Sequence, residues 1–86
     1  MKKIGYADNK NVIGARLREA RKVAGLSQQD LAARMQTMNV AMDQQMLSRI
    51  ERNLRIVTDY ELACFCEILR IPERELLQDF YLTLHQ

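Results

Sequence analysis

The sequence predicts a single all-α domain of five short helices, and three observations support this prediction. The chain has 86 residues, which suits one small domain. Apolar residues recur with a period near 3.6 along most of the chain, and no useful length of strand-like alternation interrupts them. Residues that cap helices stand in front of these periodic segments, and the chain contains one proline.

The first two helices are expected on either side of Gly25, which provides a left-handed stop. Ser27 is expected to cap the second helix, with Asp30 three residues later as its capping-box partner. Residues 1–10 have no clear period and are interpreted as a flexible arm preceding a domain at 11–86. The apolar stripes consist of Ile13, Leu17, Ala20 and Ala24 in the first helix, and of Leu31, Met35 and Met38 in the second.

Three further helices are expected after residue 42, and the segment from Gln36 to Met42 is interpreted as a helical turn followed by a loop at Asn39. Asp43 is expected to cap the third helix, and Asn53 could close it because asparagine tolerates positive φ. Thr58 with Glu61, and then Pro72, mark the starts of the fourth and fifth. The expected apolar faces are Leu62, Phe65, Cys66 and Leu69 in the fourth, and Leu76, Leu77, Phe80, Tyr81 and Leu84 in the fifth.

Charge is distributed unevenly along the chain. Residues 1–55 contain eleven Lys or Arg and five acids, whereas residues 56–86 contain two basic residues and six acids. This asymmetry favours an oriented encounter with a polyanion.

The sequence does not favour catalysis, a cofactor or a membrane span. Cys64 and Cys66 leave a helix axis about 200° apart, so they are expected to stay reduced and unbridged. With His85, the only histidine, they are too few for a structural zinc site. No apolar run approaches the roughly 18 residues of a membrane span. We therefore expect a cytoplasmic protein that is not an enzyme.

The third helix, from Gln44 to Asn53, has one apolar side and one polar side. With about 100° per residue, Leu47, Ile50 and Leu54 form a seam, whereas Glu51 lies at its edge. Glutamine can pair bidentately with adenine and arginine with guanine, so a polar face of this kind suits base reading in a DNA major groove. The side chains expected to contact bases are Gln44, Gln45, Ser48 and Arg49.

Phosphate contacts are expected at the two ends of this arrangement. The first turn of the second helix exposes backbone amides that favour an anion, and Arg side chains follow the third helix. The expected phosphate contacts are Gln28, Gln29, Arg52 and Arg55, and the helix-turn-helix motif is expected at about 27–53.

In several segments the chain resembles the phage-repressor type of helix-turn-helix, the Cro/C1 or XRE family. The matching residues are Ile13–Arg18 with Arg21, Gly25–Ala32, Ser48–Asn53, Val57–Leu62 and Ile71–Leu77. The resemblance implies a five-helix, lambda-repressor-like domain that binds double-stranded DNA, commonly as a homodimer, and regulates transcription, with repression as the expected direction. It also implies a structural pair between Arg21 and Glu51.

Two departures accompany this resemblance. The connection between the second and third helices is about five residues longer than the family's usual turn, and Asn53 stands where glycine is common. The alternative function is a protein-interaction module, such as an antitoxin or adaptor. The apolar C-terminal helix could complete the core, join two subunits or receive a protein partner.

Overall fold

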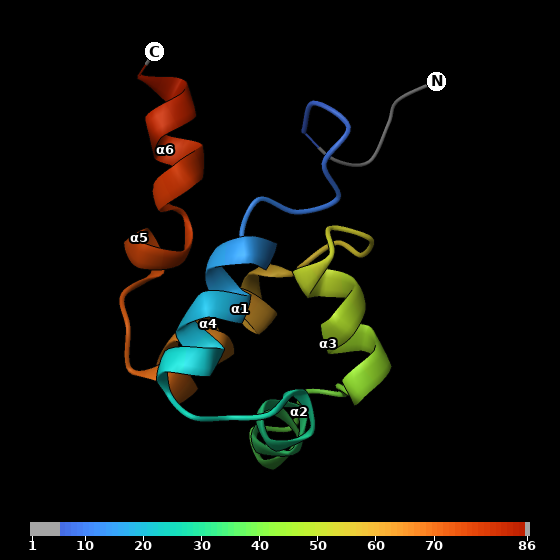
Figure 1. Cartoon of the computed structure of the whole chain (residues 1–86). Helices are drawn as coiled ribbons and strands as arrows, with labels where there is room; N and C mark the ends of the chain where they lie inside the picture. Colours follow the sequence, from blue (N-terminus) through green and yellow to red (C-terminus); the bar gives the residue numbers. More distant parts are fainter. Residues whose placement is uncertain (1–5, 86) are drawn as a thin grey trace.

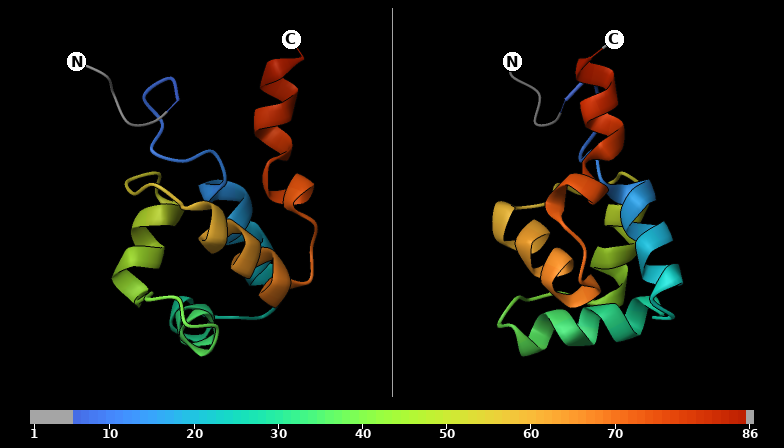
Figure 2. Two further views of the ribbon diagram at one scale, coloured as in Figure 1. Left: turned by 180° about the vertical axis from the view of Figure 1, so that it is seen from behind. Right: turned by 90° about the vertical axis from the view of Figure 1, so that its left-hand side faces the viewer.

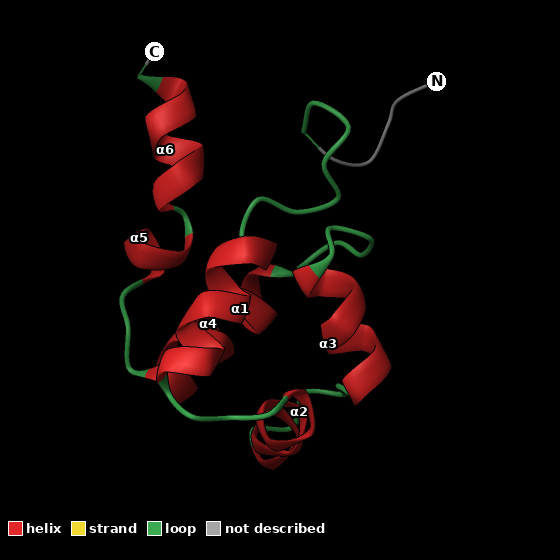
Figure 3. Cartoon of the chain, viewed as in Figure 1, coloured by secondary structure: helices red, strands yellow, loops and turns green. Residues whose placement is uncertain are grey.

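Six helices follow one another along residues 6–85, the part of the chain that the computed structural model describes (Figures 1 and 3). This range contains no strand beyond an isolated bridge between Tyr6 and Asn9. The all-α prediction is therefore confirmed. The helices are α1 (Gly14–Val23), α2 (Gln28–Thr37), α3 (Gln44–Glu51), α4 (Asp59–Leu69), α5 (Glu73–Leu76) and α6 (Gln78–Leu84).

The predicted caps are present at the starts of α2, α3 and α4. Ser27 and Asp30 form a reciprocal capping box, and Thr58 and Glu61 form a second one. The Asp43 carboxylate accepts a hydrogen bond of 2.7 Å from the backbone three residues later. These contacts satisfy backbone donors that a helix start leaves without intrahelical partners.

Each of the first five helices contributes at least one fully buried side chain to a single core. Because α3 packs against both α1 and α2, its position is fixed by apolar contacts on two sides (Figures 1 and 2). The fully buried residues are Leu17, Leu31, Met35, Leu47, Ile50, Phe65 and Leu76.

The long connection between α2 and α3 is part of the core. Val40 and Met42 are buried, and the Gln36 side chain donates a hydrogen bond of 2.7 Å to the Met42 carbonyl. Asn39 adopts a positive φ of 64°, which turns the chain after α2. Met38, expected on the apolar stripe of α2, is instead 36% exposed because the helix ends at Thr37.

The predicted fifth helix is wrong in one respect, because the chain forms two helices there. Leu77 separates α5 from α6 with ψ of 3°, far from the helical value near −42°. Pro72 has extended backbone and precedes α5, so it is an N-cap rather than the first helical residue. Leu76 is buried, but Tyr81 and Leu84 on the predicted apolar face are exposed.

The segment before α1 also differs from the expected flexible arm. Residues 1–5 lie outside the described range, but Tyr6 and Asn9 exchange backbone hydrogen bonds of 3.0 and 2.8 Å. The backbone N–H of Lys10 donates to the Asn53 side chain, which follows α3. Residues 6–10 are therefore attached to the domain.

Helix α6 is connected to the rest of the domain by two side-chain contacts besides its junction with α5. The Arg16 guanidinium pairs with Asp79 at 2.9 Å, and the hydrogen bond lowers the pKa of Asp79. Tyr6 and Phe80 meet edge to face, with ring centroids 5.2 Å apart. None of the residues of α6 is buried.

Both cysteines lie on α4 and have free thiols. Burial, with smaller contributions from Glu73 and Glu75, raises the pKa of the Cys66 thiol to about 11. Cys66 is therefore protonated at neutral pH. Cys64 is half-buried. Across residues 6–85, no helix has the length and apolar character needed to cross a membrane.

Candidate nucleic-acid interface

Helix α3 presents a continuous polar face on the outside of the molecule. Leu47 and Ile50, on its opposite side, are fully buried and fix the rotation of the helix about its axis. The outward orientation predicted for the polar side chains is therefore confirmed, and base contact by them stays a prediction. Gln44, Gln45 and Arg49 are exposed, and Ser48 is half-buried.

The apolar seam predicted for α3 is one residue too long. The helix ends at Glu51, Arg52 is its C-cap, and Asn53 turns the chain with a φ of 63°. Leu54 therefore no longer shares the helical phase of Leu47 and is 52% exposed. The prediction that Asn53 closes the helix with positive φ is confirmed.

A buried ion pair holds α3 against α1. Arg21 donates to both carboxylate oxygens of Glu51, at 2.7 and 3.0 Å, as the resemblance implied. This hydrogen bonding raises the pKa of Arg21 although burial opposes it. The same guanidinium donates to the Leu26 carbonyl at 2.9 Å, which ties the entry to α2 into the network.

The two predicted phosphate contacts at the start of α2 have different surroundings. The Gln28 side chain donates to Glu51 at 3.1 Å and so belongs to the buried network. Gln29 is exposed, and the backbone amides of both residues lie in the first turn of α2. The Asp30 carboxylate in this turn is occupied by the Ser27 amide. Phosphate binding at this turn stays a prediction, with the backbone amides as its available donors.

The two arginines after α3 also differ. Arg52 is exposed, and its Nε lies 3.3 Å from the Ser48 carbonyl. Arg55 instead pairs with Glu61 on α4, through contacts of 3.1 and 3.2 Å. A phosphate contact by Arg55 would require its guanidinium to leave or share Glu61, so this contact stays a prediction.

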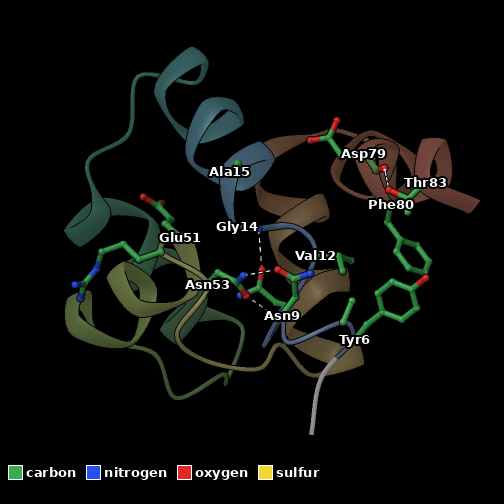
Figure 4. Close-up of a pocket in the computed structure, with 13 residues that line it drawn as sticks. Tyr6, Asn9, Val12, Gly14, Ala15, Glu51, Asn53, Asp79, Phe80 and Thr83 are labelled. Atoms are coloured by element: carbon green, nitrogen blue, oxygen red, sulfur yellow. Dashed lines mark hydrogen bonds between the residues drawn. The ribbon is translucent and has the colours of Figure 1, made fainter. Parts of the chain in front are cut away.

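Three asparagines that the sequence did not single out as partners meet at the exit of α3. Asn53 is hydrogen-bonded to the backbone of residues 10 and 11 and to the Asn9 side chain, and Asn11 bonds to carbonyls on both sides of the turn. They line a pocket of about 420 Å³ between this turn and α6 (Figure 4). Their partners are 39–44 residues apart along the chain, a distance at which no local sequence signal operates.

Together these features define a helix-turn-helix DNA-binding domain. Helix α2 and the outward-facing α3 are joined by a connection that buries Val40 and Met42, and a buried ion pair anchors α3 on α1. A family model described as a helix-turn-helix domain matches residues 12–78, and the chain belongs to this family of DNA-binding transcription regulators.

Similarity to solved structures extends over most of this chain. The crystal structure of the restriction-modification controller protein C.AhdI from Aeromonas hydrophila superimposes with a TM-score of 0.65 and 34% sequence identity. The match covers 74% of this chain and 86% of that chain. The comparison with curated proteins gave no match. The resemblance drawn from the sequence is thereby confirmed.

Proposed function

We propose that this protein binds double-stranded DNA sequence-specifically by inserting α3 in the major groove, and that it regulates transcription in the cytoplasm. The observation that carries this proposal is the exposed strip of amide and guanidinium groups on α3, opposite side chains that lock the helix in place. Its similarity to a restriction-modification controller protein supports a regulatory role. We propose repression as the outcome, in which the bound domain blocks access of polymerase to an overlapping promoter.

The proposed base contacts follow from the chemistry of each side chain. Gln44 and Gln45 each offer an adjacent donor and acceptor, which match N6 and N7 of adenine. Arg49, one turn after Gln45, can fork onto O6 and N7 of guanine. Ser48 is short, so the helix can approach the bases closely, and its hydroxyl can contact a base or a phosphate.

We propose that backbone phosphates are contacted at both ends of the motif. Arg52 is free of carboxylates in the described structure, with only the Ser48 carbonyl as its partner. The backbone N–H groups of Gln28 and Gln29 lie in the first turn of α2, where the helix dipole favours an anion. Contacts of this kind position α3 but carry no sequence information.

A homodimer is the proposed binding form. Helix α6 leaves three large apolar side chains exposed, namely Tyr81, Leu82 and Leu84, and a second subunit would remove them from water. A two-fold dimer with one α3 in each half-site would bind an inverted repeat with centres about one helical turn apart.

Selection from random duplexes at two salt concentrations tests the proposal. We expect an inverted repeat to be enriched. At both salt concentrations the protein should bind this repeat more tightly than it binds non-specific duplexes. A single half-site would support base reading without the dimer. Recovery of no motif would contradict sequence-specific binding.

Gln45→Ala is expected to weaken binding to the selected site by about 1–3 kcal/mol and to relax the base preference at one position per half-site. Gln44→Ala should act similarly at a neighbouring position. Titration of the selected duplex and of a scrambled duplex measures both effects. Equal losses on the two duplexes would contradict base reading by Gln45.

Arg52→Ala is expected to weaken binding to every duplex and to reduce the slope of log K against log salt by about one unit. The physical reason is that one fewer phosphate is neutralised, so about one fewer counterion is released. The measurement is a titration at several salt concentrations. Arg18→Ala on α1 removes the same charge at an exposed residue outside the proposed contacts and serves as the control. A slope that stays unchanged in Arg52→Ala would remove Arg52 from the phosphate contacts.

The second candidate function is a protein-interaction module that uses the exposed side of α6. The observation that favours it is the same trio of apolar side chains, of which Leu82 is 58% exposed. A module of this kind would bind DNA weakly and without preference. The selection experiment therefore distinguishes the two candidates.

A further inference from the structure

We propose that Asn53 and the segment Tyr6–Asn11 position the exit of α3 for phosphate contact, so that the N-terminal segment is a functional part of the DNA-binding unit. Asn53, Asn9 and Asn11 are here called the asparagine clasp. This inference rests on the proposed function, and it assigns to the clasp the role of positioning α3 for DNA binding.

Asn53 holds the N-terminal segment with both ends of its amide. Its Oδ1 accepts hydrogen bonds from the backbone N–H groups of Lys10 and Asn11, at 2.8 and 3.0 Å. Its Nδ2 donates to Oδ1 of Asn9 at 2.6 Å (Figure 4). The positive φ of 63° at Asn53 aims this side chain back toward the segment before α1.

Asn11 spans the turn that follows α3. Its Nδ2 donates at 2.9 Å to the carbonyl of Ile50, in the last turn of α3, and at 2.9 Å to the carbonyl of Arg55, beyond the turn. Its Oδ1 accepts from the Gly14 backbone at 2.8 Å, which fixes the same side chain to the start of α1. One amide therefore holds the two ends of the turn at a fixed separation.

The enclosed turn carries Arg52, the exposed cation at the exit of α3. A guanidinium that starts from a fixed backbone has less conformational freedom to lose when it meets a phosphate. Without the clasp, the turn at residues 52–54 would lose its restraint from the N-terminal segment. Arg52 would then lose more entropy on reaching a phosphate and would neutralise that phosphate only part of the time. The clasp thus favours DNA binding without touching DNA.

The segment that completes the clasp is itself anchored at its far end. The Tyr6 ring packs against Phe80 on α6, and the Tyr6–Asn9 turn is closed by two backbone hydrogen bonds. The family match begins at residue 12, so the clasp residues before α1 precede the matched region. Asn53 lies inside the matched region, so the clasp joins the segment before that region to the helix-turn-helix core.

Asn53→Gly is the sharpest test, because glycine accepts positive φ and only the side-chain hydrogen bonds are lost. Asn39→Gly is the matched control, since Asn39 has φ of 64° and its side chain makes no hydrogen bond in the described structure. We expect Asn53→Gly to weaken binding to the selected duplex about tenfold and to reduce the salt slope, at temperatures where thermal unfolding shows both variants to be folded. Asn39→Gly should bind as the wild type does.

Asn9→Ala provides a second variant if Asn53→Gly fails to fold. It removes one acceptor from the clasp and should weaken binding by about threefold. An unchanged Kd and salt slope in Asn53→Gly would overturn the positioning role even if stability falls. If Asn53→Gly does not fold, the same result in Asn9→Ala would overturn it. If the wild type prefers no sequence, the proposed base reading fails. The comparison of Asn53→Gly with Asn39→Gly on random duplex still tests the clasp through its salt slope.

Discussion

Glu51→Ala is expected to lower the free energy of unfolding by about 3–5 kcal/mol, because it leaves the Arg21 guanidinium buried without its counter-charge. Side-chain exposure is 9% for Arg21 and 2% for Glu51, so water cannot readily replace the lost partner. Small domains have total stabilities of about 5–15 kcal/mol, so this loss removes a large share of the free energy of unfolding. Denaturant titration followed by circular dichroism measures it.

The control for this prediction is the exposed pair Arg16–Asp79. Asp79→Ala also removes a bidentate partner, but the Arg16 guanidinium that it leaves behind stays in contact with water. This substitution should therefore cost far less stability than Glu51→Ala. Arg21→Leu combined with Glu51→Leu removes both charges and should recover much of the loss, because apolar replacement of a buried pair is often tolerated. A loss in Glu51→Ala no larger than that in Asp79→Ala would contradict an uncompensated charge at Arg21.

Gly14→Ala is expected to destabilise the domain by about 1–3 kcal/mol, although alanine is the better helix former. A Cβ at residue 14 would lie 2.5 Å from the backbone oxygen of Ile50 and 3.1 Å from that of Glu51. Both oxygens belong to the backbone of α3, so α1 and α3 would have to move apart. Thermal unfolding measures the loss, and a structure of the variant would show the displacement.

Gly25→Asn is the matched control, since a Cβ there meets nothing within 4 Å and asparagine tolerates the φ of 74°. Its melting temperature should stay close to that of the wild type. A Gly14→Ala variant as stable as Gly25→Asn would show that α1 and α3 can separate freely. The close approach at Gly14 would then have no bearing on the position of α3.

The local features of this fold could be predicted from the sequence. Ser27 with Asp30, and Thr58 with Glu61, act across three residues, and the structure has both capping boxes. The rotation of α3 was also predictable, because Leu47 and Ile50 leave one side for the core. The family resemblance supplied the pair between Arg21 and Glu51, which distance along the chain would otherwise conceal.

The features that the sequence did not predict depend on tertiary contacts. Leu77 is compatible with a continuous helix, and its break from helical ψ arises where Leu76 is already buried and α6 diverges. The position of Arg55 after α3 predicts a phosphate contact, but in the structure Glu61 lies close enough to bind its guanidinium. The asparagine clasp joins residues 39–44 positions apart, so propensity and periodicity carry no information about it.

The core ends with Leu76, and no side chain of α6 is buried. Substitutions along the outer side of α6 therefore face almost no packing constraint from the rest of the molecule. Natural selection could change the proteins that bind the outer side of α6 while the residues that hold α3 stay unchanged. For protein engineering, the same separation means that new association surfaces can be installed on α6 without redesign of the helix-turn-helix.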